Sequence, residues 1–159
     1  MSKVLIVAEH DGVRLNQSTA RCVTCAGQID PSGADILVIG HDCGQIATEA
    51  AALLGVARVL LLSRPENKAV LAALQAPQIV AVAAGYEYVL GPSTTYGKDL
   101  MPRVAALLGV GQVSDLMGVD GPRKFRRPIY AGNVVLDVEL PEGVTVVATV
   151  RAASFKPAG

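Results

Sequence analysis

The stretch "GPSTTYGKD", residues 91–99, is the part of this chain closest to a phosphate-binding loop. A nucleoside-triphosphate P-loop has the pattern G-x-x-x-x-G-K-[ST], in which backbone N–H groups hold phosphates and the last hydroxyl binds Mg²⁺. Here five residues separate Gly91 from Gly97, one too many, and Asp99 stands where the hydroxyl should be. Because a carboxylate at that position would repel a phosphate, the sequence argues against a triphosphate site.

A weaker anion-binding role remains open for the same loop. Ser93, Thr94 and Thr95 lie between a predicted strand and a predicted helix, and Lys98, the fourth candidate, stands in the first turn of that helix. The hydroxyls and free backbone N–H groups of such a loop either hold a small anion or cap the helix. Capping is the commoner role, but loops at the carboxyl ends of parallel strands are also where open α/β sheets bind ligands.

The three cysteines are the candidates for redox or metal chemistry. Cys22 and Cys25 form a C-x-x-C, but both fall in the middle of a predicted helix, whereas a reactive cysteine of such a motif needs a helix N-terminus. Their spacing puts them on one helix face, which favours burial. His41 and Cys43 would complete a zinc set of three Cys and one His, but that set is split between a helix and a loop. We therefore predict structural cysteines and no bound metal.

No residue set typical of a hydrolase is present. The chain has only two histidines, His10 and His41, and no serine in the G-x-S-x-G pattern of a nucleophile elbow. The first predicted strand–helix turn lacks G-x-G-x-x-G, so a dinucleotide site of Rossmann type is unsupported there, and Asn16 or Ser18 is expected to cap the following helix. We assign no catalytic residue and expect a protein that is not an enzyme.

The bulk composition excludes further classes of function. A length of 159 residues predicts one domain with its own core. The 14 basic and 14 acidic residues cancel, whereas a non-specific nucleic-acid binder needs a net positive field. The longest apolar runs are strand-sized, far below the ~20 residues that span a membrane. No signal peptide precedes the first predicted strand and the cysteine number is odd, so a cytoplasmic protein is expected.

The elements that must position these residues alternate over the first 110 positions. The predicted strands are 3–9, 34–40, 57–63 and 86–91, and the predicted helices are 15–29, 44–55, 65–74, 77–85 and 96–109. This alternation predicts a parallel sheet with helices on both faces. Later runs, ending with "VTVVATVR", are separated by Gly-Asn and Glu-Gly turns and are predicted as largely antiparallel strands. The fold class is α/β: a three-layer αβα Rossmann-like domain with a mostly parallel sheet and a C-terminal antiparallel hairpin.

Three segments resemble the N-terminal domain of the α subunit of electron transfer flavoprotein. They are "VLGPSTTYGKDLMPRVAALLGVGQVSDLMGV", "RPIYAGNVV" and "ATVRAASFKPAG", and the opening "KVLIVAEHDGVRLNQSTA" is similar as well. The positions that carry the resemblance are Thr94, Thr95, Gly97, Lys98, Asp99, Pro102, Arg103, Ala105, Arg127, Pro128, Ala131, Gly132, Asn133, Val150 and Arg151. Ala152 departs from the family, which usually has proline there. The resemblance covers essentially the whole chain.

The resemblance implies that residues 1–159 are a single domain of an electron carrier. It would pair with the β subunit and support a C-terminal FAD-binding domain that is absent from this chain. The intact protein would pass electrons from dehydrogenases to an acceptor, with FAD supplying the redox chemistry. AMP is expected only in the β partner, and neither a flavin ligand nor an AMP ligand is assigned here. The resemblance implies neither a nucleic-acid partner nor a membrane.

The predicted partner surface is the late hairpin. Arg126 and Arg127 stand beside Ile129 and Tyr130, and an apolar centre with an arginine rim is typical of protein interfaces. An alternative function from another class stays open: a free-standing sensor of similar fold that binds an adenine nucleotide through the loop at 91–99.

Overall fold

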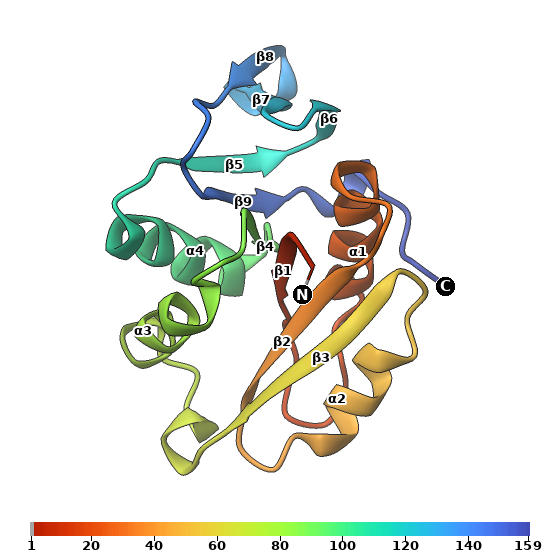
Figure 1. Ribbon diagram of the computed structural model, residues 1–159, viewed down its shortest axis with the longest axis vertical. Coiled ribbons are helices and arrows are strands. Elements are labelled where there is room, and N and C mark those ends of the chain that lie inside the picture. Colours follow the sequence, from red (N-terminus) through yellow and green to blue (C-terminus); the bar gives the residue numbers. More distant parts are fainter. Residues whose placement is uncertain (1) are drawn as a thin grey trace.

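The computed structural model describes residues 2–159 and contains a large parallel sheet beneath a small antiparallel sheet (Figure 1). The six strands of the large sheet follow the order β3-β2-β1-β4-β9-β5, and all their pairings are parallel. They are β1 (Val4–Val7), β2 (Ala34–Gly40), β3 (Val56–Ser63), β4 (Tyr88–Pro92), β5 (Gln112–Leu116) and β9 (Val146–Val150). The small sheet joins β6 (Gly118–Gly121), β7 (Lys124–Ile129) and β8 (Val134–Glu139) in that order. The α/β fold class is confirmed.

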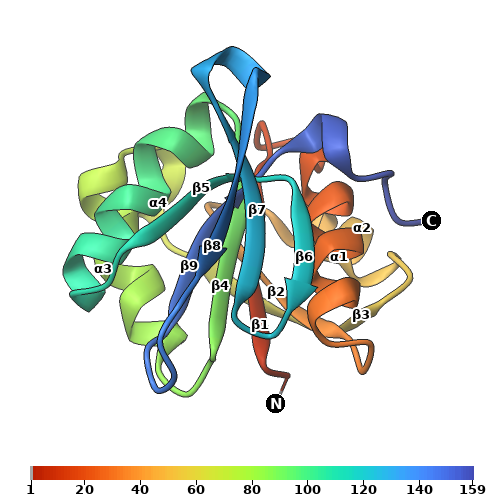
Figure 2. The ribbon, with the colours of Figure 1, turned by 90° about the horizontal axis from the view of Figure 1, so that it is seen from above.

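Helices cover both faces of the large sheet (Figure 2). One face carries α1 (Gln17–Ile29) and α2 (Gly44–Ala51), and the other carries α3 (Ala72–Ala83) and α4 (Thr95–Leu108). Short 3-10 turns occupy Pro65–Lys68, Tyr130–Gly132 and Ala152–Ser154. Since β1, β2, β4 and β9 have helices on both sides, their residues are buried throughout, which explains why these strands are almost wholly apolar. No helix among residues 2–159 is long and apolar enough to cross a membrane.

The ends of α1 and α4 follow from local chemistry. The Asn16 side chain accepts the backbone N–H of Ser18 at 2.9 Å and so caps α1. Thr94 Oγ1 accepts the N–H of Gly97 at 3.3 Å and caps α4, and α4 ends at Gly109, whose φ of 70° is left-handed. Of the two residues predicted to cap the first helix, Asn16 is the cap and Ser18 is not. The capping role predicted for the loop at 91–99 is filled by Thr94, and the helix predicted to end at residue 109 has Gly109 as its C-cap.

Residues 65–85 fold differently from the prediction of helices at 65–74 and 77–85. The structure has a 3-10 turn at Pro65–Lys68 and then the single helix α3, which contains Pro77. Pro77 removes one N–H donor from the helical ladder, but its ring lies on the exposed side. Ile79 on the same helix is fully buried against the sheet, so tertiary packing holds the helix through the proline.

Two further features of the structure differ from the prediction. Strand β9, from the run "VTVVATVR", joins the large sheet between β4 and β5 and is parallel to both, not a member of the antiparallel set. Its five residues are all buried, a burial that a two-faced central position provides. The second helix ends at Ala51 instead of residue 55, and Gly55, with φ of 93°, forms the turn into β3.

Candidate functional site

The loop at residues 91–99 holds carboxylates of the chain itself. Thr94 Oγ1 donates to Glu9 Oε2 at 2.8 Å, and the same oxygen accepts from Ser18 Oγ at 3.0 Å. Ser93 Oγ donates to Asp115 Oδ1. Because Thr94 caps α4 and Ser18 lies in the first turn of α1, the Glu9 carboxylate occupies the space between two helix N-termini, where a negative charge is stabilised.

This position is the switch point of the sheet. Strands β1 and β4 are neighbours, and the connections that follow them leave in opposite directions, so a ligand of an open α/β sheet would bind here. Sequence reasoning identified the loop but missed Glu9 and Asp115. The anion-binding role of Ser93, Thr94, Thr95 and Lys98 stays a prediction, and two adjacent carboxylates that already accept two of the loop's hydroxyl protons disfavour it.

The same crevice does not fit the pyrophosphate of a flavin dinucleotide. It lacks a glycine-rich turn, and the Glu9 carboxylate, held by Ser18 and Thr94 between the two helix N-termini, would repel a phosphate there.

The glycines that make the loop look like a P-loop have a packing role. A Cβ on Gly97 would lie 1.6 Å from the carbonyl oxygen of Pro92, and one on Gly91 would lie 2.6 Å from Met101 Sδ. Glycine at 97 lets the first turn of α4 approach the end of β4, and glycine at 91 makes room for the buried Met101. The resemblance to a phosphate loop thus reflects close contact between a strand and a helix.

A cavity of about 600 Å³ opens at the carboxyl ends of β1, β2 and β3. Its lining comes from the loops after these strands: His10, Asp11, Gly12, Val13, Gly40, His41, Asp42, Asn67, Lys68 and Val70. His10 Nδ1 accepts the N–H of Gly12 at 3.0 Å, and its Nε2–H donates to the Ile39 carbonyl at 2.6 Å. His10 therefore links, through hydrogen bonds, the loop that follows β1 to the end of β2.

The cysteines lie in the core. Cys22, Cys25 and Cys43 are free and buried, as predicted for the C-x-x-C pair. Burial raises the pKa of Cys25 to about 12 and also raises that of Cys22, so burial disfavours the thiolate that attacks or binds a metal. Among the described residues 2–159, no group of three or more His, Cys, Asp or Glu side chains is placed to hold a metal ion.

Native protein is therefore expected to react with an aromatic disulfide reagent at pH 8 at least about 100-fold more slowly than protein unfolded in guanidinium, because each thiol must wait for an opening of the core. The release of the coloured thiol measures both rates. A full equivalent that reacts at the unfolded rate in native protein would contradict this burial.

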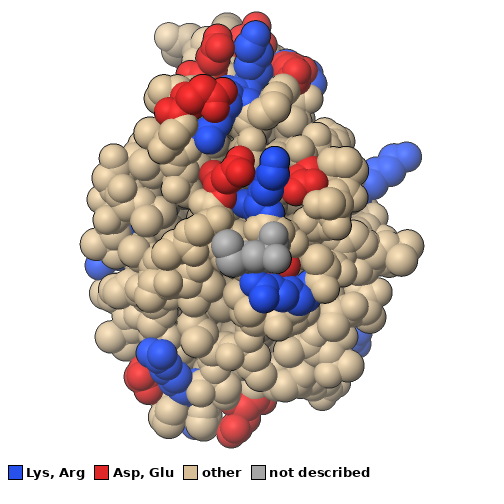
Figure 3. Space-filling model, viewed as in Figure 1, with Lys and Arg blue, Asp and Glu red and all other residues tan. Residues whose placement is uncertain are grey.

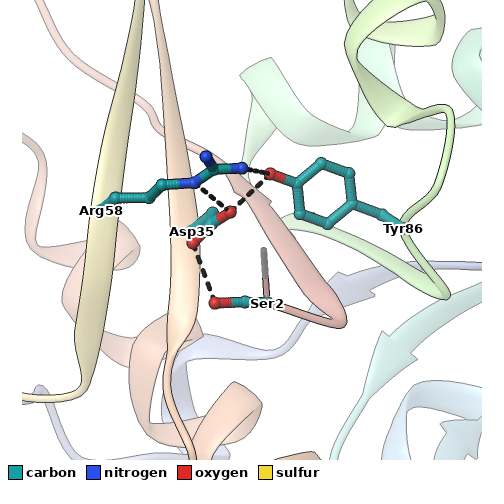
Figure 4. Close-up of polar contacts among 4 residues, drawn as sticks. All are labelled: Ser2, Asp35, Arg58 and Tyr86. Atoms are coloured by element: carbon teal, nitrogen blue, oxygen red, sulfur yellow. Dashed lines mark hydrogen bonds and ion pairs between the residues drawn. The ribbon is translucent and has the colours of Figure 1, made fainter.

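A polar network lies at the opposite, amino end of the large sheet (Figure 4). Asp35 on β2 is fully buried and accepts from Tyr86 Oη at 2.5 Å, from Arg58 Nε at 2.8 Å and from Ser2 Oγ at 2.9 Å. Arg58 also donates to Tyr86 Oη at 3.2 Å. The network links β2, β3 and the segments that lead into β1 and β4, so it stabilises the amino end of the sheet.

The small sheet exposes apolar side chains. Tyr130, at the tip between β7 and β8, is 75% exposed, and it is accompanied on β8 by exposed apolar residues that sequence reasoning missed: Val134, Val135 and Leu136. All three belong to the alternating run "VVLDVEL", whose pattern gave no signal that both faces are exposed.

The arginines predicted for the same surface have partners within the chain. Arg126 pairs with Asp120 at 2.9 Å. Arg127 donates to the backbone oxygen of Ser114 on β5 at 2.8 Å and to its hydroxyl at 3.0 Å, so it fastens the small sheet onto the large one. Ile129 is half-buried. Of the four interface candidates, Tyr130 is the one that stands clear of the domain.

Residues 4–159 match the family model described as "Electron transfer flavoprotein domain". The chain is 40% identical over 154 residues to electron transfer flavoprotein subunit alpha of Pseudomonas aeruginosa, covering 96% of this chain and 48% of that protein. It is 34% identical over 164 residues to the mitochondrial subunit alpha of Dictyostelium discoideum, covering 99% and 46%. The subunit alpha of Bradyrhizobium diazoefficiens is 40% identical over 157 residues, with 98% and 49% covered. The chain thus spans about half the length of the curated relatives it matches.

Proposed function

The chain belongs to the electron transfer flavoprotein family, and on that basis we propose that residues 1–159 are the N-terminal domain of an α subunit. The domain is a scaffold: it pairs with the β subunit and supports the flavin-binding domain of the same subunit. The intact protein carries electrons from dehydrogenases to an acceptor in the cytoplasm, and the domain itself catalyses no reaction. FAD belongs to the other half of the subunit, and AMP to the β partner.

The observation that supports pairing with the β subunit is the exposed apolar surface of the small sheet. Tyr130 lies at the β7–β8 turn, and the exposed Val134, Val135 and Leu136 follow it on β8, with Val135 on the opposite face of the strand from Val134 and Leu136. A cluster of exposed apolar residues rimmed by charged side chains marks an interaction site, whereas isolated ones do not. Strand β8 is also the outer strand of its sheet, so its backbone groups on one edge have no strand beside them.

The test is the affinity for the β subunit. Tyr130→Ala is expected to weaken binding by about 1–3 kcal/mol, because a buried tyrosine at an interface acts as an anchor. The melting temperature of the isolated domain should stay unchanged, since Tyr130 is 75% exposed within it. Leu107→Ala on α4, at 54% exposure, is the matched control and should leave the affinity unchanged. Equal affinities of the Tyr130 variant and the native chain would count against this surface.

A further inference from the structure

The two edges of the large sheet are protected to different degrees. Strand β5, at one edge, has five residues and an irregular register, and Arg127 of the small sheet binds Ser114 beside it. Strand β3, at the other edge, has eight residues and pairs only with β2. A long unpaired edge is a template for another strand, and proteins normally shorten, bend, charge or cover such edges.

The protective features of β3 are confined to its first three residues, where its pairing with β2 shifts register and the Arg58 side chain is partly exposed. From Val59 to Ser63 the pairing with β2 is regular and no residue is charged. The sequence of β3 is "VARVLLLS", and within Val56–Ser63 the only charged residue is Arg58, which turns to the buried Asp35. Leu61 is 44% exposed on the α2 side, and the half-buried Leu60 and Leu62 lie on the α3 side. The molecular face that contains β2 and β3 shows few charged side chains between its centre and its lower rim (Figure 3). The edge therefore suits an apolar strand.

The end of the described chain lies where such a strand would begin. The segment after β9 passes over α1, where Ala158 N–H donates to Ala20 O at 3.0 Å and Phe155 enters the core. Gly159 O then accepts the N–H of Leu54 at 2.8 Å, two residues before β3 starts. Figure 1 shows the C-terminus beside the start of β3. Polypeptide that continues from this point and runs along β3 would be parallel to it.

The direction of this path agrees with the rest of the sheet. The connections β1–α1–β2 and β2–α2–β3 both step toward the β3 edge, and both cross the face that α1 and α2 cover. The segment after β9 crosses the same face and also moves toward the β3 edge. A parallel strand added outside β3 would therefore give this connection the same hand as the other two, and parallel crossovers in proteins almost always share one hand.

We infer that the outer edge of β3 is the docking site for an extended segment of the α subunit that follows the position of Gly159 and adds a parallel strand to the large sheet. The inference rests on the proposed function, because it requires an α subunit of about the relatives' length. The segment that docks there is expected to be extended, with apolar side chains toward Leu61 on one face of the sheet and toward Leu60 and Leu62 on the other.

The experiment is hydrogen exchange of the backbone amides of Val56–Ser63, measured in the 159-residue chain and in the complete α subunit assembled with its β subunit and FAD. Exchange at alternate amides of β3 should be about 100-fold slower in the complete subunit, while exchange in β5 stays within about threefold. Leu61→Lys in the complete subunit should restore about a tenfold faster exchange in β3, because a lysine on an edge disfavours strand addition. Leu107→Lys on α4, also an exposed leucine, should leave β3 unchanged.

Different results would contradict the inference about the β3 edge and the proposed function of the chain. Fast exchange of β3 in a complete subunit that holds FAD and the β subunit would overturn the inference and leave the proposed function standing. A subunit that protects β3 but binds neither partner would overturn the function instead. Slow exchange in the 159-residue chain that becomes fast on dilution would mean that a second copy covers the edge, which also overturns the inference.

Discussion

Replacing Asp35 with alanine is expected to lower the free energy of unfolding by about 2–4 kcal/mol, measured by urea unfolding at pH 7. The substitution removes the acceptor of three hydrogen bonds and leaves Arg58 and Tyr86 without their common partner. Because the Arg58 side chain is 48% exposed, water replaces part of what it loses, which keeps the effect below that of a fully buried pair. Asp137→Ala, at an exposed position on β8, is the control and should change the stability little.

The same carboxylate predicts how stability depends on pH. Burial by itself would raise the pKa of Asp35, but the hydrogen bonds from Tyr86, Arg58 and Ser2 outweigh it and hold the pKa below its ordinary value of 3.8. A group whose pKa is lower in the folded state contributes stability above its unfolded pKa and loses it as the pH falls through the folded value. The native protein should therefore lose more stability below pH ~4 than Asp35→Ala does. Parallel losses in the two proteins would rule out a role for Asp35.

Replacing Gly97 with alanine is expected to cost more than about 3 kcal/mol of folding free energy, because the new methyl group has no room. Its Cβ would lie 1.6 Å from the Pro92 carbonyl oxygen, and this neighbour is backbone at the end of β4, so it cannot rotate away. To accommodate the methyl group, α4 would have to move off the sheet, with loss of the Thr94 cap and of its bond to Glu9.

Gly27→Ala is the matched control for this substitution. Gly27 also lies in a helix, α1, but a Cβ there meets nothing within 4 Å. Alanine is the better helix former, so this variant should gain about 0.5–1 kcal/mol. A Gly97 variant that unfolds at the urea concentration of the native protein would refute the close contact between α4 and β4.

Local pattern was sufficient to predict much of the fold. Features that depend on neighbours in the sequence could be predicted. They include the apolar runs of β1 and β2, the helix caps at Asn16 and Thr94 and the helix end at Gly109. The helix through Pro77 could not be predicted, since packing against the sheet outweighed the cost of the proline. The position of β9 between β4 and β5 could not be predicted either, because strand order is decided by contacts between distant segments.

The candidate site was predictable only in part. The loop at 91–99 was visible as a motif, but its partner Glu9 lies 85 residues earlier, so no local pattern joins them. The Asp35 network left one signal, an aspartate within the otherwise apolar run "ADILVIG", which indicates a buried charge that needs a partner. Tyr130 was identified from composition, whereas the exposure of Val134 to Leu136 depends on β8 being an outer strand.

We propose that this chain is a scaffold that pairs with the β subunit and carries no flavin itself. Sedimentation velocity of the 159-residue chain mixed with the β subunit and FAD, followed in the ultraviolet and in the visible, tests it most directly. We predict one faster boundary that contains both proteins in a one-to-one ratio, and no visible absorbance in the boundary of the chain alone. Two separate protein boundaries at every concentration, or flavin that sediments with the chain by itself, would contradict the claim.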